Sequence, residues 1–198
     1  MGKIRSALEI ALERTETIQS DKESIGLFEV KQQGKKIANT YLEGNLPSLE
    51  GELEKTAPSD RVHLKQGIFD VLLSQITLPV HKDDLIRLER AGTGLHLVIG
   101  EKRFKAMAGE LVQMMQQYLN EAAQYEDAIV QQYAPKLRQK EEEIARRLGR
   151  QIKLDPFQDP EFVAFFNQNM NALKANYHAV IDQVKNEALG LFKGEGNG

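Results

Sequence analysis

The chain has 198 residues, of which 41% are hydrophobic and 28% are charged, and its formal net charge is −3. This composition is typical of an ordinary globular protein and excludes a disordered chain, a collagen-like fibre and a disulfide-stabilised miniprotein. Because there is no cysteine, it also excludes thiolate catalysis and cysteine-based zinc sites. The 26 lysines and arginines nearly balance the 29 acidic residues, so net charge gives no general attraction to nucleic acids or anionic membranes.

The N-terminal segment predicts a helix and not a signal peptide. Glu9 and Glu13 interrupt its apolar residues, whereas a signal peptide needs an uninterrupted apolar stretch. No apolar run in the chain approaches the roughly 20 residues that a membrane-spanning helix needs. We therefore expect a cytoplasmic protein.

Helical spacing of apolar residues dominates residues 1–92, which we interpret as an N-terminal helical region. The predicted helices are one that ends near Ser20–Asp21, one over about 22–42, a short one carrying Leu49 and Leu53, one over about 60–78, and one over about 83–91. The helix over 60–78 has the least polar surface. We expect it to be the most buried of the five.

The residues after position 92 break this pattern. Residues 95–99 form a short apolar run between Gly94 and Gly100, which is a strand signal. Residues 151–155 alternate apolar and polar side chains and form a second, weaker signal. Because a lone strand leaves its backbone groups unsatisfied, the two would pair as a very short two-stranded β element, either within one chain or between two chains. Residues 93–100 are accordingly interpreted as a glycine-flanked connector.

Two long helices are predicted for residues 101–192. Apolar positions in the first advance 25 residues from Phe104 to Ile129 in seven steps, close to the helical period. The second begins at Asp159 and Pro160, an N-cap residue followed by proline at the first helical position. At 1.5 Å per residue each helix reaches roughly 50 Å, which favours an antiparallel hairpin. Residues 193–198 are expected to form a flexible tail.

The predicted fold is therefore all-α: one structural domain built as an elongated antiparallel helical bundle around the long-helix hairpin. The apolar stripe of the hairpin would be covered by the N-terminal helices or by a second subunit. We take this stripe as a candidate interaction surface. Its members are Phe104, Leu111, Met114, Tyr118, Tyr125, Phe162, Phe166, Leu173 and Tyr177.

The glycines near residue 94 do not make a phosphate-binding loop. Such a loop needs lysine and a hydroxyl directly after its last glycine, but Gly100 is followed by Glu101, Lys102 and Arg103. A looser hypothesis is that an anion binds at the start of the long helix, where backbone N–H groups are free. The candidate residues are His96, Gly100, Lys102, Arg103 and Lys105. The alternative is a simple turn beside a solvated basic surface.

A second cationic candidate lies further along the same helix. Lys136, Lys140, Arg147 and Arg150 fall in one row, as phosphate binding would require. Glu143 interrupts this row, and acidic residues four positions before Arg146 and Arg147 neutralise it locally. Nucleic-acid binding is therefore less favoured than a solvated helix face.

No catalytic or metal-binding motif is recognisable. A carboxylate-bridged metal centre needs two copies of Glu-x-x-His, and Asp60-x-x-His63 resembles only one. No serine lies in a G-x-S-x-G turn. We predict no metal, no cofactor and no catalytic residue.

These observations favour a non-enzymatic scaffold or protein-interaction module that forms a homo-oligomer, most simply a homodimer. The long apolar helices need a covering surface, and no chemical motif competes with that interpretation. Two alternatives remain. One is a small-molecule or phosphate-ligand binding protein, or an enzyme, with its site near residues 92–105; the other is a nucleic-acid binder through residues 136–150.

Overall fold

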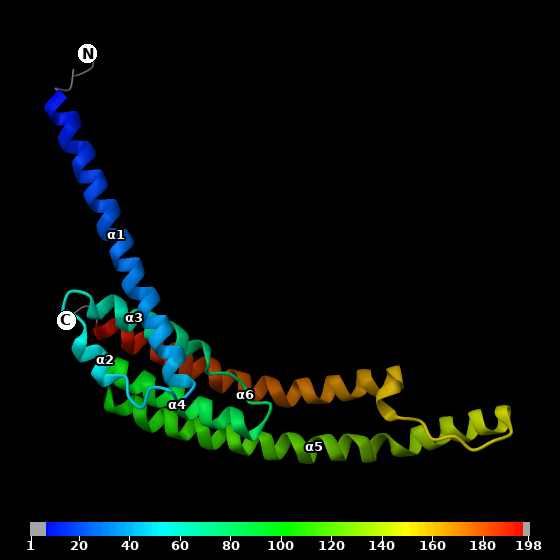
Figure 1. The fold of residues 1–198 in the computed structure, drawn as a ribbon. Helices are drawn as coiled ribbons and strands as arrows, with labels where there is room; N and C mark the ends of the chain where they lie inside the picture. Colours follow the sequence, from blue (N-terminus) through cyan, green and yellow to red (C-terminus); the bar gives the residue numbers. More distant parts are fainter. Residues whose placement is uncertain (1–6, 196–198) are drawn as a thin grey trace. The chain divides into compact units, whose positions relative to one another are not determined.

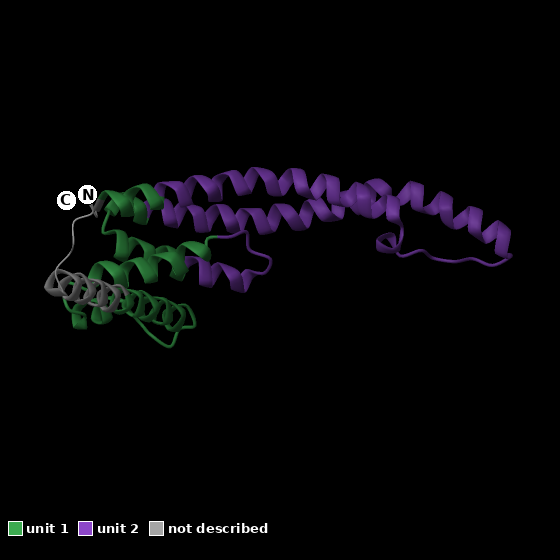
Figure 2. Cartoon of the chain, turned by 90° about the horizontal axis from the view of Figure 1, so that it is seen from above, with its two compact units in different colours: residues 1–76, 90–105, 188–198 green, residues 77–89, 106–187 purple. Residues whose placement is uncertain are grey.

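The computed structural model describes the backbone of residues 7–195 and the side chains of residues 25–194. Within these limits every regular element is helical and none is a strand, which confirms the all-α prediction. The chain divides into two compact units (Figure 2). Unit 1 comprises residues 1–76, 90–105 and 188–198, and unit 2 comprises residues 77–89 and 106–187.

The helices follow the predicted order, but several boundaries differ, and the helix predicted over 60–78 ends at Ser74. They are α1 (Ala7–Leu42), α2 (Glu50–Lys55), α3 (Arg61–Ser74), α4 (Lys82–Ile99), α5 (Lys102–Leu148) and α6 (Pro160–Glu195), with a 3₁₀ turn at Pro156–Gln158 (Figure 1). The prediction of two helices meeting at Ser20–Asp21 is wrong, because α1 is continuous there; such residues can start a helix but do not force a break. Residues 193–195 of the predicted tail are helical, and residues 196–198 lie outside the described part.

Unit 1 is held together by a close contact between α1 and α3. Gly34 of α1 and Gly67 of α3 are both buried, and a Cβ at Gly34 would lie 3.2 Å from the Cα of Gly67. The lack of side chains allows the two backbones to approach closely. Beside this contact, Lys31 Nζ lies 2.8 Å from Asp70 Oδ2 and joins the same two helices.

Helix α3 carries much of the apolar core of unit 1. Leu64, Ile68 and Leu72 are completely buried, and Phe69 is 1% exposed. The ring of Phe69 stacks on Phe192 of α6 at a centroid distance of 4.1 Å. Burial of side chains of this size is the main stabilising term of the unit.

The predicted strand 95–99 is wrong, since these residues form the last turns of α4. Leu95, Val98 and Ile99 are all completely buried, so an apolar run here reflects a helix covered on several sides. The helix ends at Gly100, whose φ of +77° favours glycine and whose N–H donates to the carbonyl of His96 at 2.8 Å. The glycine-flanked connector 93–100 is therefore helical up to its last residue.

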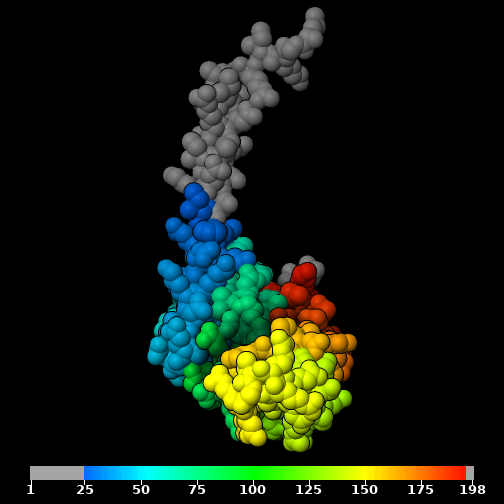
Figure 3. All heavy atoms as spheres, turned by 90° about the vertical axis from the view of Figure 1, so that its right-hand side faces the viewer, coloured from blue at the N-terminus to red at the C-terminus, as the bar shows by residue number. Residues whose placement is uncertain are grey.

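The predicted strand 151–155 is also wrong, because this segment has no regular structure. It belongs to the yellow part of the chain that faces the viewer in Figure 3. Its alternation is real, because Ile152 and Leu154 are half-buried while their neighbours are exposed. The N–H of Leu154 donates to Glu141 Oε1 of α5 at 2.8 Å. A side chain thus supplies the partner that a second strand would have supplied.

Unit 2 contains the long-helix hairpin, in which α5 and α6 pack antiparallel (Figure 1). Helix α5 runs through Pro135 without ending, although proline removes one helical hydrogen bond. Near the start of α6 the core consists of Ile129, Tyr133, Phe162 and Met170, all at most 7% exposed. In the part of the chain that the structure describes, no helix has the length and apolar character needed to cross a membrane.

Candidate functional site

The start of α6 places two carboxylates in defined positions. Asp159 has an extended backbone and Pro160 occupies the first helical position. Asp159 Oδ1 accepts the N–H of Glu161 at 3.1 Å, as the N-cap prediction requires. Asp159 and Glu161 are thereby held toward α5.

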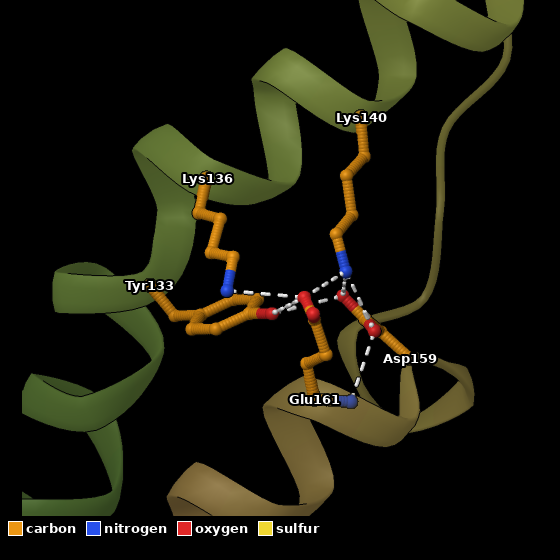
Figure 4. Close-up of polar contacts among 5 residues, drawn as sticks. All are labelled: Tyr133, Lys136, Lys140, Asp159 and Glu161. Atoms are coloured by element: carbon orange, nitrogen blue, oxygen red, sulfur yellow. Dashed lines mark hydrogen bonds and ion pairs between the residues drawn. The ribbon is translucent and has the colours of Figure 1, made fainter.

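Helix α5 supplies the cations and the hydroxyl that contact these carboxylates (Figure 4). Lys140 Nζ lies 2.7 Å from Asp159 Oδ2 and 2.6 Å from Glu161 Oε2. Lys136 Nζ lies 3.0 Å from Glu161 Oε2, and the hydroxyl of Tyr133 donates to Asp159 Oδ2 at 3.0 Å. These five residues are called the ion cluster below.

The pKa values in the ion cluster are displaced by these contacts. Hydrogen bonds from Lys140 lower the pKa of both Asp159 and Glu161, and the same two carboxylates raise the pKa of Lys140. Burial, followed by the hydrogen bond to Asp159, raises the pKa of the Tyr133 hydroxyl. All four groups therefore keep their ordinary charge states at neutral pH.

The ion cluster is a clamp rather than a reactive centre. Its two lysines face two carboxylates, so the charges cancel. The Asp159 side chain is only 9% exposed, which limits access of an external ligand to it. The cluster lies beside the aromatic core, since the rings of Tyr133 and Phe162 are 5.2 Å apart. It fixes the start of α6 against α5.

Acid is expected to weaken this clamp. The folded-state pKa values of Asp159 and Glu161 lie below their ordinary values of 3.8 and 4.5, so their contribution is complete above that range and lost as pH falls through the folded values. For Lys140 the contribution is complete below 10.5 and lost as pH rises through its raised pKa. Lys140→Met should therefore lower the melting temperature at pH 7, and the difference from wild type should shrink as pH falls below about 4.

Lys153→Met is the matched control, because Lys153 is exposed and lies on the neighbouring segment. Its melting temperature should follow that of the wild type from pH 7 down to the acid range. If the difference in melting temperature between Lys140→Met and the wild type stays constant into strong acid, the ion cluster does not stabilise the start of α6 in this way.

The predicted nucleic-acid row is divided by the structure. Lys136 and Lys140 pair with the carboxylates of Asp159 and Glu161, whereas Arg147 in the last turn of α5 and Arg150 after it are exposed. The expected pair between Glu142 and Arg146 is present at 3.9 Å. Two of the four cations are thus compensated within the chain, and nucleic-acid binding stays a prediction without structural support.

Two members of the predicted anion site near residue 100 have structural roles. Gly100 is the residue that ends α4, and His96 Nδ1 lies 3.1 Å from the carbonyl oxygen of Glu101. Lys102, Arg103 and Lys105 are exposed in the first turn of α5. Anion binding at this place remains a prediction.

The candidate interaction stripe is largely covered by the chain itself. Phe104, Leu111, Tyr118 and Phe162 are at most 5% exposed. The half-buried members are Phe166, Leu173 and Tyr177. Only Met114 and Tyr125 are exposed, at 38% each, and Tyr125 donates to Asn169 Oδ1 at 3.4 Å. The stripe therefore offers little apolar surface to a partner.

Metal-ligating residues do not gather anywhere in the described structure: no three His, Asp or Glu side chains form a group that could hold an ion. Asp84 near His81 has a structural role instead. Its carboxylate accepts the backbone N–H groups of Val80 and His81 at 2.8 and 2.9 Å, which lowers its pKa. It thereby closes the turn before α4.

Sequence reasoning misses the ion cluster as a unit. It gives Asp159 only a capping role and gives Glu161 no role. A signal is present, because Lys136 and Lys140 are four residues apart on α5 and Asp159 and Glu161 open the next helix. The antiparallel register that brings them together cannot be obtained from spacing alone.

Comparison with known protein families gives a match to most of the chain. A family model described as "Family of unknown function (DUF6657)" matches residues 50–189, which begin at α2 and include the whole ion cluster. Neither the curated proteins nor the solved structures yield a match. Since the family model covers well over half of the chain, the protein belongs to the DUF6657 family.

Proposed function

We propose that the protein is a cytoplasmic, non-enzymatic helical scaffold that forms a homodimer through α1. The observation that carries this proposal is the exposure of large apolar side chains on that helix. Ile25 is 58% exposed, Phe28 is 61% exposed and Leu27 is 37% exposed. Three neighbouring apolar side chains in water form a patch that favours a protein partner.

The two most exposed of these residues lie away from the surface that α1 uses within the chain. Ile25 is nine positions before Gly34, or two and a half turns at about 3.6 residues per turn. It therefore lies on the side of α1 opposite to the glycine that contacts α3. Phe28, six positions before Gly34, lies about 120° from that contact. A partner could cover both residues without disturbing unit 1.

The sequence before Ile25 has a coiled-coil periodicity. Apolar or small residues recur at alternating steps of three and four, which is the spacing of two-stranded coiled coils, with one lysine in the series. The series is Leu8, Ala11, Thr15, Ile18, Lys22 and Ile25.

The charges within this segment favour a second copy of the chain as the partner. In a two-fold symmetric antiparallel pair, a contact between two different positions occurs twice. In an antiparallel alignment that pairs position 25 with position 8 of the second copy, the arginine at position 14 falls within two positions of the aspartate at position 21. Opposite charges at neighbouring aligned positions occur twice in such a pair and favour a second copy of the chain as the partner.

The test is the mass of the full-length protein in solution, measured by light scattering and sedimentation equilibrium at micromolar concentration. The wild type should be a dimer. The double variant Ile25→Glu, Phe28→Glu places four charges in the interface and should raise the dissociation constant about 100-fold or more.

The matched control is the double variant Val62→Glu, Ile86→Glu, because these residues are 64% and 57% exposed on α3 and α4. It should remain dimeric. A monomeric wild type, or equal dissociation of both double variants, would rule out dimerisation through α1.

A further inference from the structure

A cavity on unit 2 lies where the segment between α3 and α4 meets the long-helix hairpin. Its volume is about 420 Å³, within the range of small-molecule sites. Apolar side chains make up most of its wall, among them Leu78, Val80, Leu119 and Met170. The small residues Ala122 and Ala123 of α5 also line it and leave it hollow.

Three hydrogen-bond donors line the same cavity. Lys174 and His178 are four residues apart and so share one face of α6, and Tyr118 stands on α5. Tyr118 is only 5% exposed, yet its hydroxyl has no hydrogen-bond partner among the described residues. Lys174 and His178 likewise have no partner in the described part of the chain. The described residues hold no fully buried side-chain oxygen or nitrogen without a partner, so the Tyr118 hydroxyl is reached from the cavity and can donate to a ligand there.

The register of the hairpin places Tyr118 and His178 at one end of the cavity. The rings of Tyr118 and Tyr177 are 5.0 Å apart, which places His178 level with Tyr118. The contact between Tyr125 and Asn169 places Glu126 at the other end. Glu126 is eight residues from Tyr118, or about 12 Å along α5. Glu126 is therefore remote from Tyr118 and His178, and Lys174 lies between the two ends of the cavity.

We propose that this cavity binds a small amphipathic carboxylate, with its carboxylate at Tyr118, Lys174 and His178 and its hydrocarbon chain over Ala122 and Ala123. A carboxylate accepts several hydrogen bonds at once and gains most from charged donors. The apolar wall receives the chain, whose burial adds to the affinity. This site is independent of α1 and of the proposed dimer.

Titration calorimetry with sodium octanoate as the probe tests the proposal on the full-length protein. Octanoate should bind with one site per chain, and the uncharged analogue 1-octanol should bind more weakly. Lys174→Gln and His178→Gln should each weaken octanoate binding about tenfold or more, as expected for losing a charge-assisted hydrogen bond. Lys153→Gln, at an exposed lysine that does not line the cavity, should leave the affinity unchanged.

Ala123→Leu provides a second test that does not depend on charge. Ala123 is exposed, so a larger side chain fills the cavity without entering the core and should abolish binding while the helicity stays that of the wild type. Absence of octanoate binding to the wild type would overturn the proposal. Binding that survives Ala123→Leu, or the loss of both Lys174 and His178, would overturn it as well.

Discussion

Gly67→Ala is expected to destabilise unit 1 by about 3 kcal/mol, near the upper end of what overpacking costs. A Cβ at this position would overlap the carbonyl oxygen of Lys31 on α1, and a backbone atom cannot rotate away as a side chain can. The two helices would have to separate, which also strains the ion pair between Lys31 and Asp70. Chemical denaturation measures the loss in the free energy of unfolding, and amide hydrogen exchange should become faster in α1 and α3.

The matched control is Gly109→Ala in α5, where an added Cβ meets no atom within 4 Å. Alanine favours a helix over glycine, so this variant should gain about 0.5–1 kcal/mol. If alanine destabilises the protein at one helical glycine and stabilises it at the other, the difference reports the contact between α1 and α3. Equal effects at both positions would show that propensity, and not the approach of α1 to α3, governs Gly67.

Helical glycines mark the limit of what the sequence predicts about this fold. Apolar spacing predicts the two long helices and their antiparallel arrangement. It assigns no packing role to Gly34 or Gly67, because glycine inside a helix only lowers helix propensity. Glycine is needed at both positions because the backbone of another helix lies against it. A pattern within one segment does not contain that information. The sequence therefore predicts the helices better than the contacts between them.

The wrong strand at residues 95–99 has a related cause. The sequence pattern makes Gly94 a break, but this glycine lies inside α4, where a Cβ would lie 2.7 Å from Leu72 and 3.0 Å from Tyr41. The glycine serves close packing, and the apolar residues that follow are buried around the helix. A buried helical turn and a buried strand have the same short apolar run, and only the partners distinguish them.

The candidate site is predictable only in part. Asp159 as the cap of α6 follows from local sequence, because a cap acts on its own helix. Helical spacing alone places Lys140 in a phosphate-binding row. It misses the true partners of Lys140, because Asp159 and Glu161 are 19 and 21 residues away in the sequence. Likewise, no local signal connects Tyr118 with His178, which are 60 residues apart. Long-range register decides both sites.

Phe162→Ala is the second variant with a large expected effect, here on unit 2. Phe162 is completely buried, and its ring lies 5.2 Å from Tyr133 and 5.7 Å from Phe166. Removing such a ring leaves a cavity, and the usual cost is about 3–5 kcal/mol. That is a large share of the roughly 5–15 kcal/mol that stabilises a typical domain. Chemical denaturation should show this loss of stability, and amide hydrogen exchange should become faster around the start of α6.

Phe157→Ala is the control, because Phe157 contacts the same cluster at ring distances of 5.1 Å to Phe162 and 5.3 Å to Phe166 but is 51% exposed. Its loss removes a ring from a surface that water already reaches, so the cost should be well under half of that for Phe162→Ala. The ion cluster gives a second readout. If the aromatic core positions Asp159 and Glu161 for Lys140, the acid dependence that Lys140 confers should disappear in Phe162→Ala and persist in Phe157→Ala. Equal destabilisation by the two substitutions would mean that the ion cluster, and not the aromatic core, holds the start of α6 against α5.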